Sequence, residues 1–151
     1  MYVDTCDSAV DLRTISSPFS GSTTSARNDY RTICGGSGPE KIFYLDMQPG
    51  ESLTIGQTSN NFDSRHHLAY GGPCPGDTNI GCIDDPDTRS VSWTNDLHKV
   101  ERVYFMIDAY SSGHGSFTIE WEIISDTCGS AVDLRSMSSP FSGSTTSPRN
   151  G

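Results

Sequence analysis

The sequence predicts an all-β protein whose strands form a jelly-roll-like β-sandwich stabilised by disulfides. Turn-forming residues are abundant, with 15 Gly, 8 Pro and 14 Asp against only 5 Glu. Asp, Gly and Pro favour turns, whereas Glu favours helices. Between the turns lie short runs of alternating apolar and polar residues, and no stretch of ten residues has a helical period. At 151 residues, the chain has the size of one ordinary domain.

The clearest strand is predicted over residues 116–124. Its odd-numbered apolar residues point one way, while Thr118, Glu120 and Glu122 point the other way. Residues 100–110 alternate in the same manner, and a Gly-containing loop over 111–115 joins the two as a hairpin. The residues expected to face the core from these two strands are Val103, Phe105, Ile107, Ala109, Phe117, Ile119, Trp121 and Ile123.

Earlier in the chain, the run 41–47 is almost continuously apolar, which is typical of a strand covered on both faces. After the turn Gln48-Pro49-Gly50, residues 51–57 alternate with Leu53 and Ile55 inward. Weaker strand patterns lie at 67–70 and 89–93. Several short strands separated by turn signals are typical of a sandwich.

An internal repeat organises the chain. Residues 4–29 recur as residues 126–151, and only five of the 26 positions differ, which gives a period of 122 residues. A period of this length corresponds to a whole domain rather than to a solenoid coil. We therefore expect residues 1–4 to end a preceding repeat or linker, residues 5–126 to form one complete repeat, and residues 127–151 to begin the next.

The cysteines are expected to form disulfides. One repeat contributes Cys6, Cys34, Cys74 and Cys82, while Cys128 repeats Cys6 and is expected to find its partner outside the chain or in a neighbouring molecule. Four cysteines allow three connectivities. The pairing Cys6–Cys34 and Cys74–Cys82 is favoured, because the second bond would close a short loop rich in Pro and Gly. Disulfides indicate an oxidising compartment, so the protein is expected to be secreted, extracellular or at the cell surface.

Several short motifs together resemble the bacterial pre-peptidase C-terminal (PPC) domain family. They are a strand with its Pro-Gly turn, a Phe-Asp-Ser unit, an Asp-Asp step and two strands joined by a Gly-containing loop, at 45–50, 62–64, 84–85, 103–108 and 115–119. The resemblance covers roughly residues 5–124. It implies a small, non-catalytic jelly-roll sandwich attached to other secreted domains. The added cysteines and the tandem repeat depart from the family and favour a structural array, as in Cys-containing repeats of extracellular fibre proteins.

The charge of the chain excludes some partners. Nineteen acidic against ten basic residues give a formal net charge of −9, which would be repelled by phosphate backbones, so no nucleic-acid partner is expected. No apolar stretch approaches the length of a membrane span. The expected partners are neighbouring copies of the same module.

No bound group is required by the sequence, although two kinds of ligand are considered. Carboxylate oxygens in a loop are the ligands that Ca²⁺ takes, and an Asp-rich turn that binds no metal is the alternative. Exposed aromatic rings can stack on sugars, and Trp93 and Tyr70 are the candidates for glycan stacking. The candidate calcium ligands are Asp63, Asp77, Asp84, Asp85 and Asp87.

No catalytic residues are predicted, so the protein is not expected to be an enzyme. The sequence has no Gly-x-Ser-x-Gly elbow, and its four histidines are not arranged with a nucleophile in any recognised motif. We therefore predict a structural repeat module of a secreted extracellular filament or cell-surface fibre, linked head to tail with its neighbours. The alternative is a carbohydrate-binding or adhesion module attached to a secreted protein.

Overall fold

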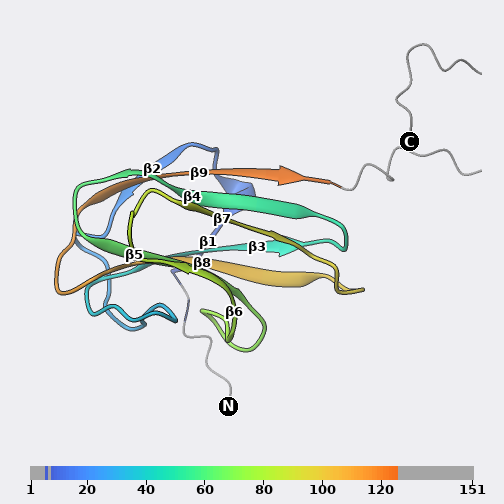
Figure 1. Ribbon diagram of the computed structural model, residues 1–151, viewed down its shortest axis with the longest axis horizontal. Helices are drawn as coiled ribbons and strands as arrows, with labels where there is room; N and C mark the ends of the chain where they lie inside the picture. The colour runs from blue at the N-terminus through green and yellow to red at the C-terminus, as the bar shows by residue number, and fades with distance from the viewer. Residues whose placement is uncertain (1–5, 7, 126–151) are drawn as a thin grey trace, which may run out of the picture.

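The structure, a computed structural model, describes Cys6 and residues 8–125. In this part of the chain, strands form two sheets packed face to face (Figure 1). The prediction of an all-β sandwich is confirmed. The elements are β1 (Val10–Asp11), the short 3₁₀ turn η1 (Leu12–Thr14), β2 (Phe19–Ser22), β3 (Lys41–Met47), β4 (Ser52–Asn60), β5 (Ser64–Tyr70), β6 (Thr78–Ile83), β7 (Ser90–Thr94), β8 (Glu101–Ala109) and β9 (Ser116–Ile124).

The two sheets differ in size. Sheet A has five strands in the order β1-β3-β8-β5-β6, and sheet B has four in the order β2-β9-β4-β7. All neighbours are antiparallel except β1 and β3, which pair in parallel. The register of β3 and β8 places Phe43 opposite Phe105 at the middle of sheet A.

The main core lies between the sheets. Phe43 of sheet A packs edge-on against Phe117 of sheet B, with ring centroids 6.2 Å apart. The predicted inward residues Leu53 and Ile55 are fully buried there, and Trp121 packs against this core while remaining partly exposed. Each fully buried large apolar side chain contributes about 1.5–3 kcal/mol to folding.

The outer face of sheet A is also buried. Ile42, Tyr104 and Met106 point away from the main core and pack with Cys6 and Cys74 in a second cluster. A set of loops, hereafter the loop layer, covers this face: Cys6, residues 27–40 and residues 71–77. This cover explains why residues 41–47 are apolar on both faces, as the sequence predicted.

The first copy of the repeated segment is part of both sheets. Val10 in β1 pairs with Phe43 in β3, and Phe19 in β2 pairs with Ile119 in β9. Leu12, between these strands, is almost fully buried in the main core. The segment thus supplies an edge strand to each sheet as well as a core residue.

Candidate functional site

Two disulfides stabilise the loop layer, one between two of its segments and one to β6, and the pairing predicted from the sequence is wrong. The bonds are Cys6–Cys74 and Cys34–Cys82. The prediction treated the chain from Cys74 to Cys82 as a loop, but Thr78–Ile83 is the extended strand β6. A strand advances about 3.3 Å per residue, which carries Cys82 beyond the roughly 7 Å that a disulfide tolerates between Cα atoms. The predicted partner of Cys128 lies outside the described residues.

His67 joins the two halves of the loop layer. Its side chain leaves β5 on the outer face of sheet A, where Nδ1 accepts a hydrogen bond from the Ile33 amide at 3.0 Å. Its Nε2 donates to the Pro75 carbonyl at 3.1 Å. These bonds require the neutral imidazole with its proton on Nε2. The backbone next to Cys34 and the backbone next to Cys74 are therefore held by one ring.

Burial changes the charge of several groups around β5. It lowers the pKa of His66, on the core side of β5, and of His67 to about 4. Burial also raises the pKa of Asp108, in β8, to about 6, while Ala109 N donates to its Oδ1 at 2.7 Å. At neutral pH the two histidines are therefore uncharged. The Asp108 carboxylate is ionised at this pH, and its burial in that form destabilises the folded protein.

We expect the described sandwich to lose stability as the pH falls from about 6.5 to about 4. In this window the unfolded chain protonates His66 and His67 while the folded protein does not, which costs up to about 7 kcal/mol for the two. Asp108 acts in the opposite direction, because it is protonated at a higher pH in the folded protein than in the unfolded chain. It offsets up to about 3 kcal/mol of this loss of stability between pH 6 and 4. Urea unfolding at pH 7 and pH 4.5 measures the net loss; equal free energies at the two values would refute it.

The five candidate calcium ligands are not gathered at one point. Asp84 pairs with Arg65, with 3.2 Å between Oδ1 and Nε, and Asp77 accepts a hydrogen bond from the Thr78 hydroxyl at 3.2 Å. Asp63 and Asp85 are exposed. Within Cys6 and residues 8–125, no group of three or more His, Cys, Asp or Glu side chains is arranged to hold a metal ion.

Asp87 accepts hydrogen bonds within the protein. Its Oδ2 accepts hydrogen bonds from the Ser64 amide at 3.1 Å and from Asn60 Nδ2 at 2.9 Å. The side-chain amides of Asn60 and Gln57 both donate hydrogen bonds to the Ser64 hydroxyl. Asp87 thereby fastens the chain before β7 to the turn between β4 and β5.

The two candidate glycan-stacking residues stack on each other. Tyr70 of sheet A and Trp93 of sheet B lie with ring centroids 4.8 Å apart and planes inclined by 20°. Both rings are partly buried against the main core. The pair closes one side of the sandwich, and neither ring is presented alone as a stacking platform.

Trp93→Ala is accordingly expected to lower the free energy of unfolding by about 2 kcal/mol, because it removes a stacked, half-buried pair. Chemical denaturation followed by circular dichroism measures this loss. The matched variant Tyr110→Ala removes an exposed ring that contacts only Arg65 among the ring contacts described, and should cost less than 1 kcal/mol. Equal losses in the two variants would contradict this account.

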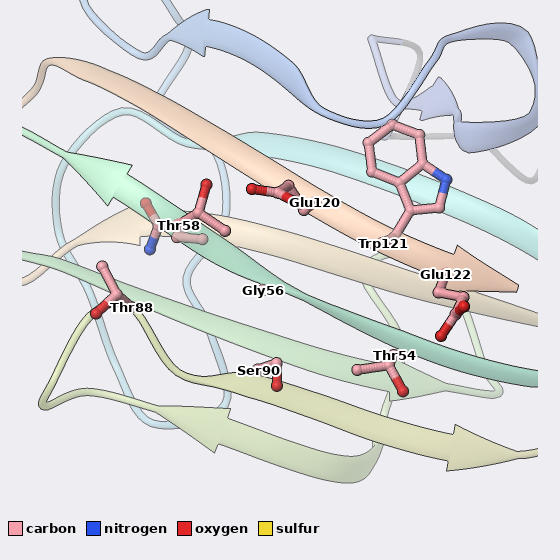
Figure 2. Close-up of a pocket in the computed structure, with 9 residues that line it drawn as sticks. Thr54, Gly56, Thr58, Thr88, Ser90, Glu120, Trp121 and Glu122 are labelled. Carbon is pink, nitrogen blue, oxygen red and sulfur yellow. The ribbon is translucent and has the colours of Figure 1, made fainter.

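The outer face of sheet B is lined with hydroxyl groups. Cross-strand pairs join Ser20 to Thr118 at 2.8 Å and Thr54 to Ser92 at 2.7 Å. Gly56 allows β4 and β7 to approach closely, since a Cβ there would lie 2.6 Å from Ser90 Cα. The result is a shallow hollow of about 340 Å³. Figure 2 shows its polar lining, with the indole of Trp121 on the other side of β9 from Thr54, Thr58, Thr88 and Ser90.

Serine and histidine side chains, which could act as nucleophile and base in other proteins, are dispersed in this structure. Ser64 and His66 are fully buried and share Gln57 as a partner. Ser92 belongs to the hydroxyl pair with Thr54, and His114 contacts Thr24 at 3.2 Å in a different part of the molecule.

Comparison with known proteins gives a likeness of fold. No protein-family model matches the chain, and no curated protein matches it. Among solved structures, the fold is similar to PliG of Aeromonas hydrophila, a periplasmic lysozyme inhibitor of g-type lysozyme. The TM-score is 0.53 at 12% sequence identity, over 78% of this chain and 96% of that one. The likeness supports the sandwich architecture.

The two disulfides bear on the location of the protein. Two disulfides indicate that it folds in an oxidising compartment. Among Cys6 and residues 8–125, no helix is long and apolar enough to cross a membrane.

Proposed function

We propose that this chain is a structural repeat module of an extracellular filament or cell-surface fibre, joined head to tail with neighbouring modules. The observation that carries the proposal is the place of the repeated segment in the sandwich. Its first copy pairs with β3 and β9, buries Leu12 and bonds Cys6 to Cys74. In the second copy, the equivalent residues are all present as Cys128, Val132, Leu134 and Phe141.

The second copy needs partners of its own. In the described sandwich, β1 already pairs with the outer edge of β3, and β2 already pairs with the outer edge of β9. Cys74 is already bonded to Cys6. A segment of 26 residues is far too short to bury a core alone. A second sandwich, with its own equivalents of β3, β9 and Cys74, supplies what the segment lacks. Repetition of this arrangement gives an array in which each module contacts its neighbours.

The sequence itself provides the test. Gly151 occupies the position in the second copy that Asp29 occupies in the first. A protein made of residues 1–151 followed by residues 30–125 therefore contains two complete modules, and residues 124–128 join them as in the given sequence. Its eight cysteines should all be oxidised, so that titration with a thiol reagent under denaturing, non-reducing conditions finds no free thiol. The 151-residue chain should show one, at Cys128. A free thiol that persists in the two-module protein would refute the proposal.

A carbohydrate-binding or adhesion role is the second candidate. The hydroxyl-lined hollow on sheet B supports it, since Glu120 and Glu122 beside Ser and Thr side chains can bind sugar hydroxyls. Pull-down on insoluble polysaccharides should then give saturable binding that Glu120→Ala removes and Trp93→Ala retains. Absence of saturable binding on any polysaccharide tested counts against this role.

A further inference from the structure

One end of the sandwich exposes apolar side chains where β9 leaves it. Ile124, the last residue of β9, is 52% exposed, and Val100, just before β8, is 50% exposed. Asn95 holds this end together, because its Nδ2 donates to the carbonyls of Met47 and Lys99 at 2.9 Å each. Figure 1 shows β3 and β9 ending on this same side. We call this surface the exit end.

The loop layer carries a hollow and a second exposed apolar residue. The hollow has a volume of about 570 Å³ and is lined in part by Tyr30, Arg31 and Pro75. Ile33 is 45% exposed and lies beside it, because the Ile33 amide and the Pro75 carbonyl both bind His67. Cys6, where the chain enters the described module, bonds to Cys74 next to Pro75. The chain therefore enters each module close to this hollow.

The length of chain between modules brings these two surfaces together. Only Ser125, Asp126 and Thr127 separate Ile124 from Cys128, the equivalent of Cys6. Four residue steps span at most about 14 Å. If Cys128 bonds within the next module as Cys6 does here, with 5.9 Å between Cα atoms, the next module's loop layer must lie near Ile124.

We infer that the exit end of each module packs against the loop layer of the module that follows it, with Ile124 against Ile33 and the adjoining hollow. The partner is thus a second copy of this fold. Charge agrees with this contact, since Glu122 is exposed beside the exit end and Arg31 is exposed at the hollow, where the neighbouring Asp29 is already paired with Arg27 at 2.6 Å. The inference rests on the proposed tandem function and adds the surfaces through which neighbours are held in one orientation.

The two-module protein allows a test with a built-in control. Ile33→Asp in the second module places a charge in the inferred contact, whereas the same change in the first module falls on a loop layer that no preceding module covers. The second-module variant is expected to increase the radius of gyration in X-ray scattering. It should also lower the melting temperature by about 3–6 °C more than the first-module variant.

Substitutions of Ile124 must show the reverse dependence on the module. Ile124→Asp should increase the radius of gyration and lower the melting temperature when it is made in the first module, but not when it is made in the second. If each substitution has the same effect in both modules while no free thiol is present, the inferred contact is wrong and the tandem proposal stands. If a free thiol remains in the unsubstituted two-module protein, the tandem proposal fails, and this inference with it.

Discussion

In a chain that ends at residue 125, deleting residues 4–29 is expected to abolish cooperative folding, whereas deleting the nearly identical residues 126–151 from the 151-residue chain leaves the free energy of unfolding unchanged. The first deletion removes an edge strand from each sheet, the buried side chain of Leu12 and the disulfide to Cys74. Loss of Leu12 alone creates a cavity that costs about 2–5 kcal/mol. Together these losses approach the roughly 5–15 kcal/mol that stabilises a typical domain.

The two deletions form a matched pair, because the removed segments have the same length and differ at only five positions. Thermal unfolding followed by circular dichroism and calorimetry gives the comparison. A cooperative transition that survives deletion of 4–29, or one that disappears on deletion of 126–151, would show that the first copy is not the one built into the sandwich.

Removal of both disulfides, in a variant with Ala at positions 6, 34, 74 and 82, is expected to cost about 8 kcal/mol. The bonds span 68 and 48 residues, and closing loops of this length stabilises by about 4 kcal/mol each in the chain-entropy description. The loop layer should lose its structure first, because Cys34–Cys82 bonds it to β6 of sheet A and Cys6–Cys74 joins two of its segments. Hydrogen exchange should then show Met106 and its neighbours in the outer cluster losing protection before the main core.

Cys128→Ser is the control for this prediction. It removes a cysteine without touching either described bond, so the denaturation midpoint of the 151-residue chain should not change. A midpoint that falls as far in Cys128→Ser as in the four-cysteine variant would mean that the disulfides of the module are not the two described.

The sequence predicted the strands that lie at the centre of the sheets. The bounds of β3 and β9 are those expected from the runs 41–47 and 116–124, because buried central strands have strong apolar patterns. The strand β6 was not predicted. It pairs only with β5, at the edge of sheet A, and its apolar residues Ile80 and Ile83 do not alternate with a period of two.

The incorrect disulfide pairing has the same origin. Without β6, the chain from Cys74 to Cys82 looked like a short loop, whereas the strand places Cys82 opposite His67 on β5. The surroundings of the candidate site residues could not be predicted from the sequence for a different reason. The contacts of these residues depend on neighbours that are far away in the sequence. Asp87 accepts a hydrogen bond from the backbone N–H of Ser64, and Trp93 stacks on Tyr70.

The exposed residues of the inferred contact between modules also could not be predicted from sequence patterns. Ile33 lies in a loop, and Ile124 lies on the polar face of its strand, so no alternation distinguishes either from an ordinary surface residue. The repeat did identify the segment 4–29, but it did not indicate with which strands the segment pairs.

The bond made by Cys128 tests the central claim most directly. Proteolysis of the two-module protein without reduction, followed by mass spectrometry of the linked peptides, identifies its partner. The tandem account predicts a bond between Cys128 and the second module's copy of Cys74, as Cys6 bonds to Cys74 in the first. A bond from Cys128 to any other cysteine, or an unpaired Cys128, would contradict it.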